Sequence, residues 1–420
     1  MDDVAAVDYY VGALSDSDYV VRATAAENLG ELGAGTAVPH LMNLLSDPVD
    51  IVRWAAATAL GDIHDVTACP ILAIALSDPS DSVRKAAAIA LSKMGDAAAA
   101  PNLIRAMAGP DRDARKSAAA ALDNLGEAAS PHIVSALSDP DYNLRRVAAV
   151  LLGKFGYDAI PYLVKALSDS HLFVSSAAAA ALCRQGSAAI PYLIESLADS
   201  DGSTRWMAVD VLSQIAHITA IPHLVQALKD PVDYVRLRAA VALHKMRNTA
   251  IPYLIQGLRD SNDCVRRQSA WMLGEIGSVA ATPRLIEAVG DSDASVRREA
   301  TTALGKLGDA TALPLFIESL RDSDGAVRRE AAKALGRLGD PTSVPYLIEA
   351  LSDSDDSVRR AVMTALGKLG DSAAVPYLMD ALSELDNSIS WAAAESLAEL
   401  LSSKIQYDAA LLEKWAADLT

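Results

Sequence analysis

The sequence predicts an all-α protein, an α-α superhelix or solenoid built from about thirteen helical hairpins. The first observation is an arginine that recurs every 30 or 31 residues, with Ser175 and Ser390 holding two of its thirteen slots. The second is a proline that keeps the same step, and the third is a composition rich in alanine and leucine but only 5% aromatic. Self-similarity at such a period is typical of solenoids, in which each repeat packs on its neighbours. The arginines are Arg22, Arg53, Arg84, Arg115, Arg145, Arg205, Arg236, Arg266, Arg297, Arg328 and Arg359.

One repeat, Val344 to Ala374, shows why each unit should form a hairpin. Because Pro345 lacks a backbone donor, it suits the first turn of the helix PYLIEAL. Serine and aspartate then supply caps for a second helix, SVRRAVMTALGKLG, whose apolar residues recur at helical spacing. Gly370 ends this helix, because glycine tolerates the left-handed conformation there. Each hairpin therefore has an apolar side that only neighbouring repeats can bury.

The repeated pattern also points to a family. Pro-x-Leu-Ile-x-x-Leu-x-Asp followed by Val-Arg-x-x-Ala-x-x-Ala-Leu-Gly-x-Leu-Gly-Asp resembles the HEAT repeat, and more narrowly the short HEAT-like repeat named after phycobilisome lyases. The resemblance covers roughly residues 5–400, and it implies that the proline helix lies on the convex side and the Val-Arg helix on the concave side. Residues 401–420 depart from the pattern and are expected to form a C-terminal capping helix. Since no linker interrupts the array, residues 1–420 are predicted to form a single continuous domain.

An acidic residue stands six positions before almost every arginine slot, and Gly109 is the exception. A recurring Asp–Arg pair could suggest repeated catalytic machinery, but its regularity fits a structural role better. We expect this aspartate to cap the inner helix and to meet arginines of its own and adjacent repeats in a ladder along the stack.

The repeat leaves free the positions one, five and nine after the arginine slot, which share one exposed strip of the inner helix. At the first and last of these, 14 side chains are basic and 4 are acidic across 26 places. The count predicts a basic inner groove in a protein whose formal net charge is -17. A solvated surface remains the alternative, since cations near a helix C-terminus also complement the helix dipole. The candidate site residues in these basic rows are Arg267, Arg298, Arg329 and Arg360.

The centre of the strip differs from its flanks, because large apolar groups stand where other repeats carry basic or polar ones. Exposed apolar groups on such a strip usually mark a binding surface, although a shifted register would instead bury the tryptophans between repeats. Cys264 is in addition a candidate reactive thiol, at the start of an inner helix beside two arginines. The candidate binding residues of the centre are Phe173, Trp206, Asp210, Tyr234, Leu237, Cys264 and Trp271.

These features favour a non-enzymatic repeat scaffold that binds an acidic or helical protein partner in a basic concave groove with an apolar centre. The alternative, which rests on the resemblance, is a phycobilin lyase or bilin-handling chaperone acting on phycobiliproteins, with a linear tetrapyrrole as its substrate. Arg267 and Arg298 would then meet the propionates of the tetrapyrrole. The apolar residues that would hold it are Trp206, Tyr234, Leu237 and Trp271.

Several other classes of protein are disfavoured. None of the seven histidines is followed by glutamate, and no catalytic or metal-binding motif occurs, so we expect no catalytic residue, metal or resident cofactor. A net charge of -17 would repel nucleic acid at long range. No apolar stretch approaches the roughly 18 residues of a membrane span. The acidic start and three widely spaced cysteines predict a cytoplasmic protein.

Overall fold

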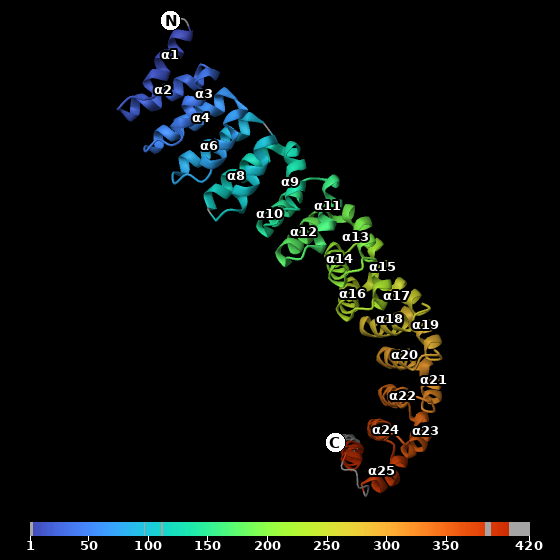
Figure 1. The fold of residues 1–420 in the computed structure, drawn as a ribbon. Coiled ribbons are helices and arrows are strands. Elements are labelled where there is room, and N and C mark those ends of the chain that lie inside the picture. The colour runs from blue at the N-terminus through green and yellow to red at the C-terminus, as the bar shows by residue number, and fades with distance from the viewer. Residues whose placement is uncertain (1–2, 96, 111, 383–387, 403–420) are drawn as a thin grey trace, which may run out of the picture. The chain divides into compact units, whose positions relative to one another are not determined.

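The computed structural model describes residues 3–95, 97–110, 112–382 and 388–402. The chain forms two compact units, Met1–Val211 and Leu212–Thr420. Within each unit, shorter and longer helices alternate along the chain and form two layers (Figure 1). The described ranges contain no strand, and the predicted all-α solenoid is confirmed. The expected capping helix falls almost wholly outside the described residues, and the single continuous domain stays a prediction.

The shorter helices form the outer layer. All of them except α1 carry the recurrent proline in their first turn, where its missing N–H group is not needed. A short 3-10 turn leads into each of these proline-bearing helices. The outer helices are α1 (Asp3–Ala13), α3 (Val38–Leu44), α5 (Cys69–Ala75), α7 (Ala100–Ala108), α9 (Ser130–Ala136), α11 (Ile160–Lys165), α13 (Ile190–Ser196), α15 (Ile221–Gln226), α17 (Ile251–Gly257), α19 (Thr282–Ala288), α21 (Leu313–Ser319), α23 (Val344–Glu349) and α25 (Val375–Ala381).

The longer helices carry the arginine slot and form the inner layer. In the second unit they lie on the concave side of the row and the outer helices lie on its convex side, as the resemblance implied (Figure 1). A final helical stretch spans residues 388–402. The inner helices are α2 (Tyr19–Glu31), α4 (Asp50–Ile63), α6 (Asp81–Met94), α8 (Arg112–Leu125), α10 (Tyr142–Leu152), α12 (Leu172–Gln185), α14 (Gly202–Ile215), α16 (Asp233–Met246), α18 (Asp263–Ile276), α20 (Ala294–Leu307), α22 (Gly325–Leu338) and α24 (Asp356–Leu369).

The ends of the inner helices follow from the sequence, with one correction. Gly370 ends α24 in the left-handed conformation with φ of 68°, as expected. The aspartate six before the arginine slot, however, does not cap the helix. Asp353 accepts the N–H of Asp355 at 2.8 Å within the loop, and Asp355 is the N-cap that accepts the N–H of Ser357 at 2.8 Å. The cap therefore lies two residues later than predicted, because Asp353 is committed to an arginine.

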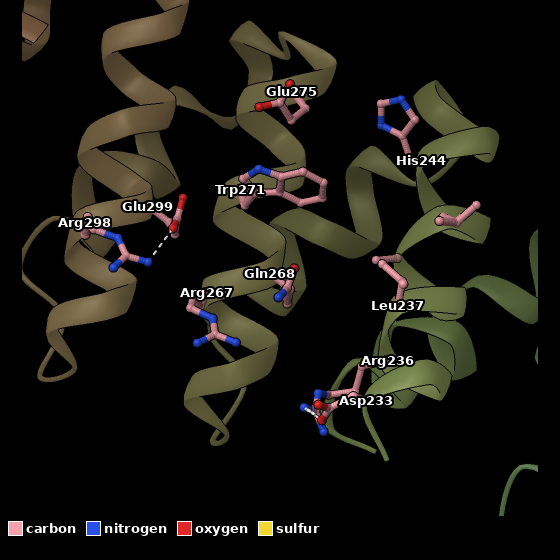
Figure 2. Close-up of a pocket in the computed structure, with 12 residues that line it drawn as sticks. Asp233, Arg236, Leu237, His244, Arg267, Gln268, Trp271, Glu275, Arg298 and Glu299 are labelled. Atoms are coloured by element: carbon pink, nitrogen blue, oxygen red, sulfur yellow. Dashed lines mark hydrogen bonds and ion pairs between the residues drawn. The ribbon is translucent and has the colours of Figure 1, made fainter. Parts of the chain in front are cut away.

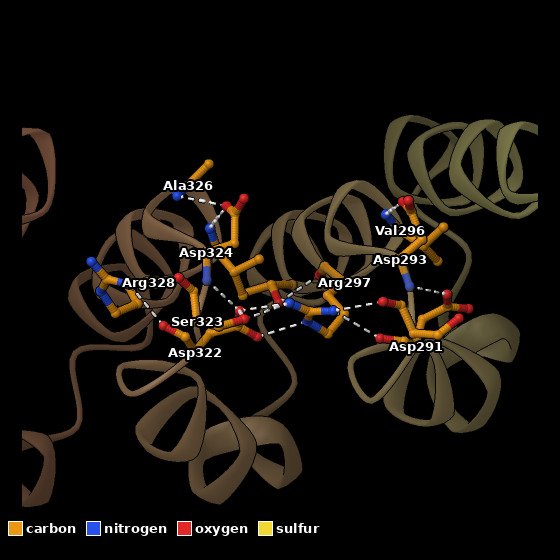
Figure 3. A network of polar contacts seen from close by, with 12 residues as sticks. Asp291, Asp293, Val296, Arg297, Asp322, Ser323, Asp324, Ala326 and Arg328 are labelled. Atoms are coloured by element: carbon orange, nitrogen blue, oxygen red, sulfur yellow. Dashed lines mark hydrogen bonds and ion pairs between the residues drawn. The ribbon is translucent and has the colours of Figure 1, made fainter. Parts of the chain in front are cut away.

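The predicted ladder of arginines and aspartates is confirmed. Arg297 donates from Nε and Nη2 to the two carboxylate oxygens of Asp322, both at 2.7 Å, and from Nη1 to the carbonyl of Asp291 at 3.0 Å (Figure 3). Burial raises the pKa of Asp322, but the hydrogen bond from Arg297 and a backbone N–H outweigh it and hold that pKa below its ordinary value. The same bidentate pairs are Arg22–Asp47, Arg53–Asp78, Arg145–Asp169, Arg266–Asp291 and Arg328–Asp353.

Neighbouring inner helices approach each other through small residues. A Cβ added to Gly305 would lie 2.8 Å from the Cβ of Ala334, and one added to Gly336 would lie 2.9 Å from the Cα of Ala365. Such distances leave no room for a side chain, so glycine is required at these crossings. The core around them consists of fully buried leucines and alanines, which explains why the chain uses so few aromatic residues.

Candidate functional site

A cleft of about 770 Å³ lies on the inner side of α16, α18 and α20, entirely within the second unit (Figure 2). Three large apolar side chains from two helices, together called the apolar wall, are exposed to solvent in the cleft: Leu237 (67%) and Val241 (46%) on α16 and Trp271 (38%) on α18. A group of exposed apolar side chains gathered in one cleft often marks an interaction site. The residues that line the cleft are Asp233, Arg236, Leu237, Ala240, Val241, His244, Arg267, Gln268, Trp271, Glu275, Arg298 and Glu299.

Three arginines reach the cleft, and two of them are neutralised by acids beside them. Arg236 pairs with Asp233, and Arg298 donates to Glu299 at 2.8 Å. Glu275, the remaining acid of the cleft, pairs with Lys306 from α20. Arg267 is half-buried and has no ion pair with any described residue. It is therefore the uncompensated cation of the cleft, next to the apolar wall.

The cleft coincides with a break in the arginine ladder. Arg236 keeps the regular donation to the carbonyl of Asp230, but its carboxylate partner is Asp233 of its own helix, where the regular pattern would give Asp260 of the next repeat. Asp260 accepts a hydrogen bond from Gln226 at 2.8 Å. The side chain of Arg236 is 31% exposed, compared with 14% for Arg297 in the intact ladder. The junction between α16 and α18 has thus released an arginine that other repeats use to hold the stack.

The structure gathers some of the predicted site residues and leaves others apart. Leu237, Arg267, Trp271 and Arg298 all line the cleft, as the grouping of apolar and basic positions suggested. Tyr234 is 48% exposed in the first turn of α16, outside the lining. The other candidates outside the lining are Cys264 at the start of α18, Arg329 on α22 and Arg360 on α24.

Three further candidates belong to the first unit. Phe173 on α12 is 61% exposed, and its ring lies 5.4 Å from that of His171. Trp206 and Asp210 on α14 are both partly buried. Their place in a binding surface stays a prediction.

The sequence count overstated the free positive charge of the inner face. Lys93 pairs with Asp62 at 2.7 Å, and Lys154 pairs with Asp123, in each case across neighbouring repeats. Acids outside the counted rows neutralise others, as Glu330 does for Arg329 at 3.2 Å. Asp62 and Lys93 occupy the same position in consecutive repeats. Looking for an acid and a base placed in this way would have revealed such pairs. Sequence reasoning also missed Arg236, His244 and Gln268 of the cleft.

The chain belongs to the HEAT-repeat family. The family model for HEAT repeats matches nearly its whole length, as overlapping segments at residues 7–82, 67–123, 130–205, 175–244, 190–269, 251–329 and 314–398. No curated protein matches the chain significantly. Among described residues, no group of histidine, cysteine and acidic side chains is arranged to hold a metal ion, and no helix combines the length and apolar character of a membrane span.

Solved structures of similar fold include proteins of different kinds. A chain from a structure of Kap95p bound to RanGDP is 15% identical with a TM-score of 0.42, and the match covers 96% of this chain and 67% of that one. An engineered protein is 20% identical with a TM-score of 0.34, covering 95% and 99%. The complex of CpcE and CpcF of phycocyanin lyase from a Nostoc species is 27% identical with a TM-score of 0.31, covering 50% and 86%.

Proposed function

We propose that this protein is a non-enzymatic scaffold whose inner face binds an acidic protein partner, with the cleft of α16, α18 and α20 as the anchor point. The observation that carries the proposal is the exposed apolar wall of Leu237, Val241 and Trp271 beside the uncompensated Arg267. Protein interfaces combine a few large buried anchors with a polar rim in this way.

The surroundings of the cleft support a polypeptide as the ligand. Several exposed cations of the inner face are paired with acids across or within repeats, as Lys306 is with Glu275 and Lys85 with Asp81. Such exposed pairs contribute little to stability, and their partners can be exchanged at low cost. A polar face with an apolar cleft suits an extended partner that makes many weak contacts around a stronger anchor.

A peptide selection tests this proposal and does not require the partner to be identified first. A phage-displayed library of random peptides would be panned against the purified protein, and enriched peptides would be titrated against the wild type and Trp271→Ala. We expect enriched sequences to be acidic with apolar anchors, and the variant to bind them about tenfold more weakly, since it loses a central anchor.

Tyr346→Ala is the matched control, because Tyr346 is a 42% exposed aromatic residue on the outer helix α23. It should bind the enriched peptides like the wild type. The proposal fails if the selection enriches no acidic sequence, or if the enriched peptides bind Trp271→Ala as tightly as the wild type.

The alternative proposal is a phycobilin lyase or bilin-handling chaperone of phycobilisomes, and the same cleft favours it. Leu237 and Trp271, two of the residues predicted to hold the tetrapyrrole, form its apolar wall, and Arg267 and Arg298 lie beside them. Mixing the protein with phycocyanobilin and recording the visible spectrum separates the two proposals. An unchanged spectrum at tens of micromolar removes the bilin proposal. Either role suits a cytoplasmic location, where free thiols such as Cys69 persist.

A further inference from the structure

Each pair of consecutive inner helices crosses at a fixed pair of positions in the repeat. The first position is eight residues after the arginine slot, and the second is six residues after the slot of the next repeat. At most crossings the pair is a glycine against an alanine or serine, and a Cβ on the glycine would lie 2.7 to 2.9 Å from the facing residue. These pairs are Gly30–Ala59, Gly61–Ala90, Gly153–Ala181, Gly274–Ala303, Gly305–Ala334, Gly336–Ala365 and Gly367–Ser396.

The crossing of α16 and α18 carries large residues at both positions. His244 stands where the regular repeats have glycine, and Met272 stands where they have alanine. Met272 is fully buried and His244 is partly buried, so both side chains take up space between the two helices. In consequence α16 and α18 approach each other far less closely than α18 and α20 do. The cleft is the space that this separation leaves on the inner side.

Two further observations support this cause. The crossing of α8 and α10 in the first unit pairs Asp123 with Leu151, and a smaller cavity of about 260 Å³ lies there, lined by both residues. In addition, Nδ1 of His244 is buried and has no hydrogen-bond partner among the described residues. An unsatisfied buried polar atom destabilises a fold by about 1–3 kcal/mol, so a histidine at this position disfavours folding. Rules of packing are commonly broken in this manner at functional sites.

The chemistry of the walls specifies the ligand. Arg267 and Trp271 lie one helical turn apart on the same face of α18 and both reach the cleft. A ligand that binds both Arg267 and Trp271 needs a carboxylate and an apolar group that are as far apart as these two side chains. Asp233 and Glu299 already pair with Arg236 and Arg298, so those two arginines offer no free charge to a second carboxylate. The charge balance therefore fits one carboxylate beside one apolar group.

We propose that the cleft is a preformed receptor for an amphipathic partner helix that presents an apolar side chain and a single carboxylate one turn apart, and that His244 and Met272 set its width. The inference rests on the proposed function and names the occupant of its anchor point. A helix is the occupant that matches, because residues four apart on a helix lie as far apart as Arg267 and Trp271 do, and an open cleft between two helices accepts the ridge of a third.

A set of synthetic peptides tests the ligand chemistry by calorimetric titration. The reference is an alanine-based helix with a leucine and a glutamate four positions apart, in either order. We expect it to bind at least about tenfold more tightly than the same helix with glutamine, or with the glutamate moved to the opposite face. An extended peptide with the two residues at alternate positions, and free 2-naphthoate, should bind more weakly than the helix. Equal or tighter binding of either one overturns the assignment of the occupant.

Variants of the crossing test the role of its two residues. The double substitution His244→Gly and Met272→Ala restores the small pair of the regular repeats and should close the cleft, with a loss of peptide affinity of at least about tenfold. His244→Phe keeps the bulk of the side chain without the imidazole and should retain most of the affinity that the double variant loses. Ser92→Gly, the same repeat position in α6, is the matched control and should change nothing. Circular dichroism checks that each variant remains helical.

The outcomes separate this inference from the proposed function. If peptides from the library selection bind and depend on Trp271, but closing the crossing or removing the carboxylate has no effect, the inference is wrong and the scaffold proposal stands. If no acidic peptide is selected although the designed helix binds as described, the inference stands and the wider scaffold proposal fails. If His244→Phe loses binding as fully as the double variant, the crossing does not act through its width.

Discussion

Two regions of the second unit place different residues at the same repeat positions. These regions are the regular repeats from α18 to α24 and the junction between α16 and α18. In the regular repeats the arginine slot holds the stack, as Arg297 does with Asp322 at 2.7 Å, and glycine lets the helices touch, as Gly305 does at Ala334. At the junction Arg236 has left the ladder, and His244 keeps the helices apart. The same unit therefore contains repeats held together by the ladder and a cleft in which apolar groups and Arg267 lack partners among the described residues.

This contrast shows how a solenoid can gain a site without losing its fold. Each repeat contacts mainly its neighbours, so a weakened junction affects one interface and leaves the others intact. The groups released from packing become available to a ligand. In this chain the release gives a cleft with one apolar wall and one free cation, Arg267.

The largest expected effect comes from removing an arginine of the intact ladder. Arg328→Ala leaves the carboxylate of Asp353, whose side chain is only 10% exposed, without its cation. We expect a loss of about 3 kcal/mol in the free energy of unfolding, as for other broken buried pairs. Arg236→Ala at the junction should lose less than about 1 kcal/mol, as for an exposed pair. Urea denaturation followed by circular dichroism measures both. Equal losses would show that the ladder does not hold the regular repeats.

The next effect comes from placing the histidine of the junction at a regular crossing. Gly336→His puts a large side chain where a Cβ alone would lie 2.9 Å from Ala365. Overpacking of this kind should destabilise the protein by about 2 kcal/mol. His244→Ala should change the free energy of unfolding by less than about 1 kcal/mol, because it also removes a buried nitrogen without a partner. A fully tolerated histidine at position 336 would contradict the role assigned to the crossings.

The dependence of stability on pH separates the two regions further. The hydrogen bond from Arg328 lowers the pKa of Asp353 below its ordinary value of 3.8, and this outweighs burial. Because the pKa in the folded state is depressed, the stabilisation is complete above the ordinary pKa and is lost as pH falls through the depressed one. Asp353→Asn should flatten this acid limb by at most about 1.4 kcal/mol per pH unit.

Unfolding titrations between neutral and acidic pH measure this slope. Asp233→Asn is the control at the junction, since the side chain of Asp233 is 90% exposed. It should leave the acid limb unchanged. An acid limb that Asp353→Asn does not alter would mean that the ladder aspartates do not cause the acid sensitivity.

The smallest expected effect is that of salt. Binding of the acidic helix should weaken by about threefold as ionic strength rises from low to physiological, because exposed charges are screened over about 8 Å at 0.15 M. The buried ladder should respond less, so the free energy of unfolding should change little over the same range. Titrations at increasing sodium chloride measure the first quantity. Affinity that is independent of salt would argue against a part for Arg267 in binding.

The fold could be predicted almost completely, because thirteen copies of one pattern reinforce every local signal. The helices, the glycines that end them and the ladder all follow from residues that recur at a fixed spacing in the sequence. The misplaced cap shows the limit: Asp353 and Asp355 are both good capping residues, and only the reach of Arg328 decides which one is free. Leu237 and Trp271 were found because they break a periodic pattern on an exposed face.

The rest of the site could not be predicted, because it depends on which residues of different repeats meet. The sequence alone does not show that His244 lies at the crossing of α16 and α18, where its size affects the distance between the helices. The charge of the groove was overestimated for the same reason, since the pairing of Lys306 with Glu275 joins two repeats. The pattern within a repeat can be recognised in a sequence. Contacts between repeats can be predicted only when the register of one helix against the next is known.

A double-mutant cycle between Arg267 and the carboxylate of the designed helix is the most direct test of the account. The affinities of wild type and Arg267→Gln would be measured with the glutamate helix and with its glutamine counterpart. A coupling free energy of about 1.5 kcal/mol or more is predicted, as for close charge pairs in interfaces. A coupling below about 0.3 kcal/mol would show that the two groups do not meet, and would contradict the assignment of the cleft as a carboxylate receptor.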